Sequence, residues 1–363
     1  MFKREKNMLS EQLFDILFDK RLKEHAQATR EQLMRFIQQP KRIKTDQIVS
    51  FTKWHNSSLS PYSSMRSLFL EEQEDLQDGG YYICLQGKGI VVNPGTDFFK
   101  TFCEKGYSLQ DIDIVIATCD CPSIQNALFE LQTLNARGNQ KLVSYSEAPH
   151  LIRFFLHPKQ YGRLVGQFRP TFREERSSLI SLETFSHKEE VYQLVQELEL
   201  AYMTTESGAL ALRLDAEERS IGFITRGGYL PAMEQFFMPC QVLIGGIGTN
   251  SIEDFEKVAF MKASLGFYGL WQLIERAENL ELVLVSEFSR AMGDLRIELL
   301  RKLQKGLEKA PLILPMDSTF AVDLQEQTAV CENGTHCLLG QLRVIRSDGS
   351  FGKLQYVANE DLL

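Results

Sequence analysis

The length, composition and charge of this chain exclude several classes of protein. At 363 residues, 44% of them hydrophobic, it exceeds a typical single domain and can bury a large core, although large α/β sandwiches reach this length as one unit. The formal net charge of −8 argues against a nucleic acid as direct ligand, because phosphate contacts need a basic surface. No apolar run approaches the ~18 residues of a membrane-spanning helix, so we expect no membrane contact.

The cysteines indicate a compartment rather than a disulfide framework. There are seven of them, an odd number, and the N-terminus is charged where a signal peptide would be apolar. We therefore expect a cytoplasmic protein with reduced thiols.

The chain begins with an amphipathic segment. Residues 9–39 place Leu13, Ile16 and Leu17 on one face, and Pro40 stops the pattern. We expect an N-terminal helical extension that packs on the remainder of the protein; docking on a partner is the alternative.

The stretch 79–126 organises the rest of the chain. Gly89–Val92 is typical of a short buried strand and ends at the turn signature Asn93–Gly95. A short helix follows, and then Ile112–Ala117 is a second buried strand. That strand leads into the loop Thr118–Ile124, and another helix begins there.

Further elements follow in order. Strands are predicted at Leu142–Ser144, Gly208–Leu214, Ser220–Ile224, Val242–Gly248 and Leu282–Phe288, with helices at His187–Leu198 and from Ser251 onward. After Pro311 short strands alternate with Gly, Asn and Asp turns, which predicts a small β appendage.

These elements resemble the metallo-β-lactamase fold. The strand pair, Pro-Gly turn, helix and Ile-Asp-Ile-Val-Ile-Ala-Thr strand match its opening, and Ser286–Phe288 with Gly293–Arg296 match a later stretch. The resemblance implies an α/β fold, an αββα sandwich of two mixed sheets flanked by helices. We divide the chain into a helical extension (1–48), the sandwich (49–310) and the C-terminal β appendage (311–363).

The resemblance also implies where a two-metal site would lie, and its ligands are replaced here. In that family a His-x-His-x-Asp-His loop follows the second strand, a later turn supplies an aspartate, and a further segment supplies a histidine. The residues at these degenerate metal-site positions are Cys119, Cys121, Ser123, Ile124, Arg226 and Ser264.

The first functional hypothesis follows from this replacement. It is a pseudoenzyme, not an enzyme, that binds no metal or other cofactor and serves as a scaffold, sensor or regulatory subunit of a complex. Its partner is another protein subunit or a second copy of the chain. The apolar residues expected at the contact are Ile124, Tyr229, Leu230, Phe236, Phe237 and Met238.

Two alternatives stay open. One is a metal-dependent hydrolase of the phosphodiesterase or nuclease type, whose rebuilt site uses zinc bound by Cys119 and Cys121, the only alternating pair in the loop able to converge. The other is an anion site made by Arg226 with the backbone of Gly245 and Gly246. Against the latter, Arg226 is expected to pair with Asp113 or Asp120.

Overall fold

The structure is a computed structural model that describes most of the chain. The described residues are 2–41, 45–51, 79–95, 98–144, 150–168, 180–185, 191–248, 260–288, 296–307, 311–316, 321–325, 328–330 and 336–338. None of the described helices combines the length and the apolar character that crossing a membrane requires.

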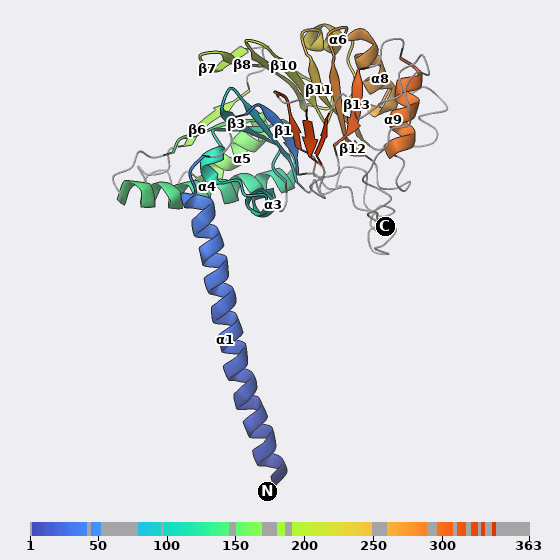
Figure 1. The fold of residues 1–363 in the computed structure, drawn as a ribbon. Helices are drawn as coiled ribbons and strands as arrows, with labels where there is room; N and C mark the ends of the chain where they lie inside the picture. The colour runs from blue at the N-terminus through green and yellow to red at the C-terminus, as the bar shows by residue number, and fades with distance from the viewer. Residues whose placement is uncertain are drawn as a thin grey trace.

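The N-terminal helix α1 (Phe2–Gln38) projects from the body of the protein (Figure 1). Its C-terminal end is the part that packs, with Phe36 and Ile37 buried against the body. Over residues 16–32 the helix is exposed, including Ile16 at 66% and Phe18 at 56% of their surface. The prediction that the extension packs on the sandwich is therefore correct only for the last turns.

The first sheet is mixed and includes strands from both ends of the chain. Its described order is β16-β15-β14-β1-β2-β3-β4-β5-β6, in which β3 to β6 run parallel and the other pairs antiparallel. The bounds are β1 Gln47–Ser50, β2 Tyr81–Leu85, β3 Lys88–Val92, β4 Ile114–Ala117, β5 Ile152–Leu156, β6 Ile180–Thr184, β14 Ala321–Asp323, β15 Thr328–Val330 and β16 His336–Leu338.

The second sheet has the described order β13-β12-β11-β10-β9-β8-β7, with β10 to β13 parallel. Its bounds are β7 Val191–Val195, β8 Leu198–Thr204, β9 Leu210–Ala216, β10 Ser220–Ile224, β11 Val242–Gly248, β12 Leu282–Phe288 and β13 Leu312–Pro315. The predicted C-terminal β appendage is thus present as strands, and those strands extend both sheets.

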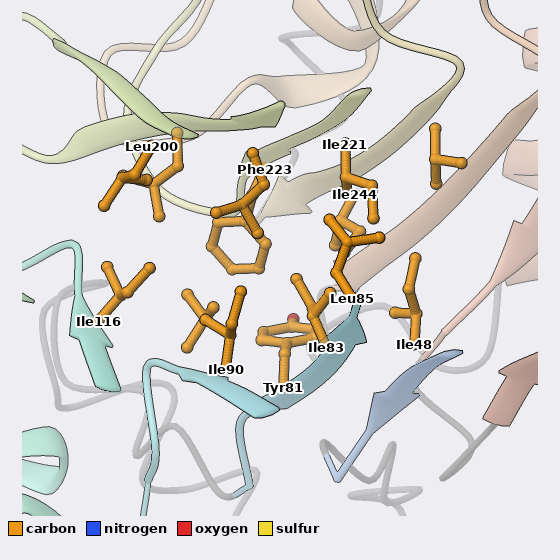
Figure 2. Close-up of a cluster of buried hydrophobic side chains, with 14 of the residues drawn as sticks. Ile48, Tyr81, Ile83, Leu85, Ile90, Ile116, Leu200, Ile221, Phe223 and Ile244 are labelled. Carbon is orange, nitrogen blue, oxygen red and sulfur yellow. The ribbon is translucent and has the colours of Figure 1, made fainter. Parts of the chain in front are cut away.

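Three hydrophobic layers hold the sandwich together. The middle layer lies between the sheets, where Tyr81 and Ile83 of the first sheet face Phe223 and Ile244 of the second (Figure 2). The outer layers lie between each sheet and its helices. These helices are α3 Phe98–Glu104, η3 Leu109–Asp111, α4 Pro122–Ser144 and α5 Pro158–Phe168 on the first sheet, and α6 Ala232–Phe237, α8 Gly266–Arg276 and α9 Arg296–Lys305 on the second. The predicted αββα sandwich is confirmed.

Two predicted elements are wrong and several lie outside the described residues. Leu142–Ser144, predicted as a strand, is the last turn of α4. Within His187–Leu198, predicted as a helix, Val191–Val195 forms the edge strand β7, and Leu198 begins β8. The helix start at Ser251 and the final predicted strands beyond residue 338 lie outside the described residues.

Candidate functional site

The candidate site lies where parallel strands of both sheets end. The loop 118–121 follows β4, Arg226 follows β10, and Glu287 lies at the end of β12. Contacts between the sheets bring these ends together: the Leu210 amide donates to the Thr118 carbonyl at 2.8 Å. In open α/β sheets the carboxyl ends of parallel strands are the usual place for ligands.

Cys119 and Cys121 converge in this loop. Their Sγ atoms are 2.8 Å apart, and both side chains are buried. The chain bends at Cys119, and this bend brings the two alternating residues together. Gln160 of α5 fixes the backbone by donating from Nε2 to the Cys121 carbonyl at 2.9 Å. Asp120 points the other way and forms an ion pair with Arg163.

The two thiols differ in acidity because they share one hydrogen bond. The bond from Cys119 and the charge of Arg226 lower the pKa of Cys121, against the effect of burial. The same hydrogen bond, together with burial, raises the pKa of Cys119 well above its ordinary value. Cys121 is therefore the first to become a thiolate, and Cys119 keeps its proton and donates it to that sulfur.

Arg226 and Ser264 are brought to the same edge by a pair of backbone contacts. Gly227 donates its amide to Ala263 O, and Gly228 donates to Lys262 O, both at 2.8 Å. Ser264 is buried, and its side chain occupies the space that a Cβ on Gly248 would need. These contacts attach the Arg226 loop to the segment before α8.

The carboxylates predicted to pair with Arg226 have other cations as partners. Asp113 accepts from Lys41 and lies 3.9 Å from Lys88, and Asp120 pairs with Arg163. In place of these carboxylates, the thiols of the Cys119–Cys121 pair lie within the electrostatic reach of Arg226.

The remaining predicted site residues have structural surroundings. Ser123 and Ile124 lie buried in the first turn of α4, and Ile124 packs in the outer hydrophobic layer with the two cysteines. Gly245 and Gly246 lie inside β11, paired with β12 on one side, and a Cβ on Gly246 would be 2.3 Å from Thr225 O of the other neighbour. The anion-binding role of Arg226 with these glycines stays a prediction.

Sequence reasoning missed a link between the sheets at this edge. The Tyr81 hydroxyl lies 2.6 Å from Ser286 Oγ and donates to Glu287 Oε1 at 3.2 Å. Glu287 has a φ of 58°, an uncommon conformation for a residue with a side chain, and such residues cluster at functional sites. The signal available in the sequence was the polar pair Ser286-Glu287 near the end of a strand whose first four residues are all apolar.

A second contact that the sequence did not predict fixes the start of the cysteine loop. Asn93, at the end of β3, has a φ of 49°, and its Nδ2 donates to Thr118 Oγ1 at 2.7 Å. Its Oδ1 accepts from the Thr118 amide at 2.8 Å. This reciprocal pair fixes the residue that precedes Cys119.

The donor set does not fit the two-metal cluster that the fold resemblance implies. The described residues contain no group of three or more His, Cys, Asp or Glu side chains able to hold a metal ion. Two thiolates on one tetrahedral zinc, with Zn–S bonds of about 2.3 Å, lie about 3.8 Å apart. The Cys119 and Cys121 sulfurs, at 2.8 Å, are closer than that. The prediction that no metal is bound stays a prediction.

The partner surface predicted from the sequence is corrected in part. Ile124 and Phe237 are fully buried and cannot contact a partner. Met238 is 48% exposed, and Tyr229 and Leu230 are partly buried. The predicted protein partner, or second copy of the chain, stays a prediction.

Comparison with known proteins identifies the fold. No protein-family model and no curated protein sequence matches the chain. Among solved structures, the metallo-beta-lactamase fold protein YhfI from Bacillus subtilis is similar with a TM-score of 0.52 and 10% identity, covering 76% of this chain and 98% of that one. A diphosphatase from the PhnP family is similar with a TM-score of 0.51 and 11% identity, covering 74% of this chain and 94% of that one.

These comparisons overturn one sequence prediction. The chain was expected not to be an enzyme because the ligand positions are replaced, and that expectation is wrong: a structural neighbour is a diphosphatase. Replacement of the side chains at the expected ligand positions shows a different donor set and does not show a loss of catalysis. Similarity to these structures over about three quarters of its length shows that the chain has the metallo-β-lactamase fold.

Proposed function

We propose that this chain is a hydrolase of anionic esters, of the phosphodiester or phosphomonoester class, acting at Cys119, Cys121 and Arg226. The observation that supports it best is the pair of sulfur atoms 2.8 Å apart at the carboxyl ends of the parallel strands. The fold supports the hydrolase class as an analogy, and the site supports the chemistry.

Each residue has a separate task in this reaction. Arg226 is always protonated and can hold a phosphate group through two parallel hydrogen bonds. Cys121 supplies the nucleophile: its thiolate attacks phosphorus, and the ester oxygen leaves and takes a proton from water. A second water then cleaves the sulfur–phosphorus bond and regenerates the thiol. Cys119 stabilises the thiolate through its hydrogen bond.

The test is hydrolysis of chromogenic esters by the purified full chain. We expect turnover of bis(p-nitrophenyl) phosphate or p-nitrophenyl phosphate, and a loss of at least about 100-fold in kcat/KM for Cys121→Ser. Arg226→Lys keeps the charge but not the bidentate geometry, and should mainly raise KM. The matched control is Cys240→Ala. That buried cysteine precedes β11, so it lies at the amino ends of the parallel strands, opposite the candidate site.

A chelator arm separates two forms of the proposal. Activity that survives chelator and disappears in Cys121→Ser supports the thiolate mechanism. Activity lost with chelator and restored by zinc supports the metal-dependent form, in which Cys119 and Cys121 would be two of the ligands after their sulfurs move apart to about 3.8 Å. Failure of the wild-type chain to hydrolyse any ester of either class would contradict the proposal.

A further inference from the structure

The two thiols of the site are also placed for chemistry that hydrolysis does not use. We propose that Cys119 and Cys121 form a reversible disulfide, which makes the loop after β4 a redox modification site with hydrogen peroxide as its oxidant. The proposal rests on the geometry of the pair and does not need the chain to be a hydrolase.

The first argument is proximity. The sulfur atoms are 2.8 Å apart, and a disulfide bond of about 2.05 Å needs them to approach by a further ~0.8 Å. The loop backbone is fixed on both sides of the pair, at Thr118 by the Leu210 amide and at Cys121 by Gln160. The thiols therefore meet without any rearrangement of the strands.

The second argument is contrast with the other thiols. Cys119–Cys121 is the only sulfur–sulfur contact among the described residues. Cys84 and Cys240 are each enclosed in a hydrophobic layer, and burial raises their pKa to about 11 and about 12. Cys103 is partly exposed and hydrogen-bonds to Gln32.

Access to the pair suits a small oxidant. The cysteine side chains are 6% and 9% exposed, and Pro122 beside them is exposed. They lie just below the surface, where the small exposed area suits an oxidant of about the size of water, such as hydrogen peroxide.

The reaction is a two-electron oxidation of the pair. The Cys121 thiolate attacks one peroxide oxygen, the O–O bond breaks, and hydroxide leaves, giving a sulfenic acid on Cys121. Cys119 then attacks that sulfur and gives up its proton, and the hydroxyl group leaves as water. In total two thiols and one hydrogen peroxide give one disulfide and two waters, and an external dithiol reverses the reaction.

The test uses peptide mass spectrometry on the full chain. Trypsin releases Gly106–Arg137, which contains Cys119 and Cys121 and no other cysteine. After one equivalent of hydrogen peroxide and alkylation under denaturing conditions, we expect this peptide about 2 Da lighter and unlabelled. Dithiothreitol should restore two alkylation sites, and Cys84 and Cys240 should be fully alkylated throughout.

Variants make the assignment specific. In Cys119→Ser the peptide should carry a sulfenic acid trapped by dimedone instead of the lost mass, and in Cys121→Ser the remaining thiol should stay alkylatable. Cys240→Ala should oxidise like the wild type. Oxidation of Cys103 while Gly106–Arg137 keeps both thiols, or a disulfide to another peptide, would overturn the proposal.

Two readouts keep this inference separate from the proposed function. If the chain hydrolyses esters through Cys121, peroxide should abolish that activity and dithiothreitol should restore it. If no hydrolysis is found, the mass shift alone decides the disulfide. Equal oxidation by glutathione disulfide and by peroxide would contradict the assignment of a small oxidant.

Discussion

At the scale of single residues, close backbone approach at Gly89 is the most demanding contact. A Cβ at this position would lie 1.7 Å from Asp111 O, so the helical turn before β4 has no room for a side chain. We expect Gly89→Ala to lower the free energy of unfolding by more than ~3 kcal/mol. Gly162→Ala, at an exposed position of α5 with open space around it, should instead raise it by roughly 0.5–1 kcal/mol. Urea unfolding measures both, and equal effects would contradict this account.

His157 makes stability depend on pH. Its Nε2 lies 2.9 Å from Gly208 O, its Nδ1 accepts from the Lys159 amide, and burial lowers its pKa. The unfolded state therefore takes up a proton at a higher pH than the folded state does. The free energy of unfolding should fall as pH drops below about 6.5, and the contribution should be fully present above it.

Comparison with His157→Gln isolates this contribution, because the carboxylates titrate in both proteins. The difference in unfolding free energy between wild type and variant should shrink from pH 8 to pH 5. A difference that is constant over that range would show that His157 does not titrate as the structure indicates.

The candidate site could be predicted from the sequence only in part, because some of its contacts lie within one loop and others join distant segments. Cys119 and Cys121 alternate within one short loop, so the sequence could predict that they point to the same side. It could not predict the bend at Cys119 that brings their sulfur atoms to 2.8 Å. The surroundings of Glu287 did not, because Tyr81 reaches it from the other sheet. The partners of Asp113 could not be predicted either: Lys41 comes from beyond the end of α1.

At the scale of elements, the local hydrophobic pattern predicted most of the buried strands correctly and was wrong at the end of α4 and at β7. Gly138 inside α4 looks like a helix end, yet a Cβ there would lie 3.1 Å from Ile37 and 3.2 Å from Leu109. It permits α1 and η3 to approach, so the helix continues through it. The segment Val191–Val195 has apolar residues at helical spacing, but sheet pairing with β8 makes it a strand.

The helix α1 allows a direct test of how little its exposed part contributes to the body. Deleting residues 2–30 removes the exposed stretch 16–30, which includes Ile16 and Phe18, and should change the free energy of unfolding by less than about 0.5 kcal/mol. Deleting residues 2–40 also removes buried Phe36 and Ile37, and should cost more than ~3 kcal/mol. Thermal unfolding of both truncations decides, and a large effect of the shorter deletion would reveal contacts of α1 with the body beyond its last turns.

At the scale of the whole molecule, the resemblance predicted what periodicity could not. Buried apolar runs such as Val242–Gly248 indicate strands, but nothing in their spacing assigns them to one sheet or two. The two-sheet arrangement was expected only from the family-like order of turns and strands. In the structure β4 lies in the first sheet and β11 lies in the second, as that order predicts.

The strand β14 ties the C-terminal part of the chain to β1, with Val322 fully buried opposite Ile48. Its pairing residues bury apolar surface in the layer between the sheets. Ending the chain at residue 320 should therefore leave the edge of β1 exposed, and we expect a lower unfolding temperature and concentration-dependent association. Light scattering during a thermal ramp measures both. A truncated chain that remains monomeric up to the wild-type unfolding temperature would contradict the prediction.

The same pairing has a consequence for biosynthesis. The strand β1 leaves the ribosome shortly before one of its neighbours, β2, whereas its other neighbour, β14, is translated only after all the described strands of the second sheet. Until then one edge of the first sheet lacks its native cover. Such long-range pairing slows folding and prolongs the time during which a nascent chain can aggregate. The protein thus completes its first sheet only after its second sheet has been synthesised, and throughout that interval the uncovered edge of β1 is open to nascent-chain chaperones.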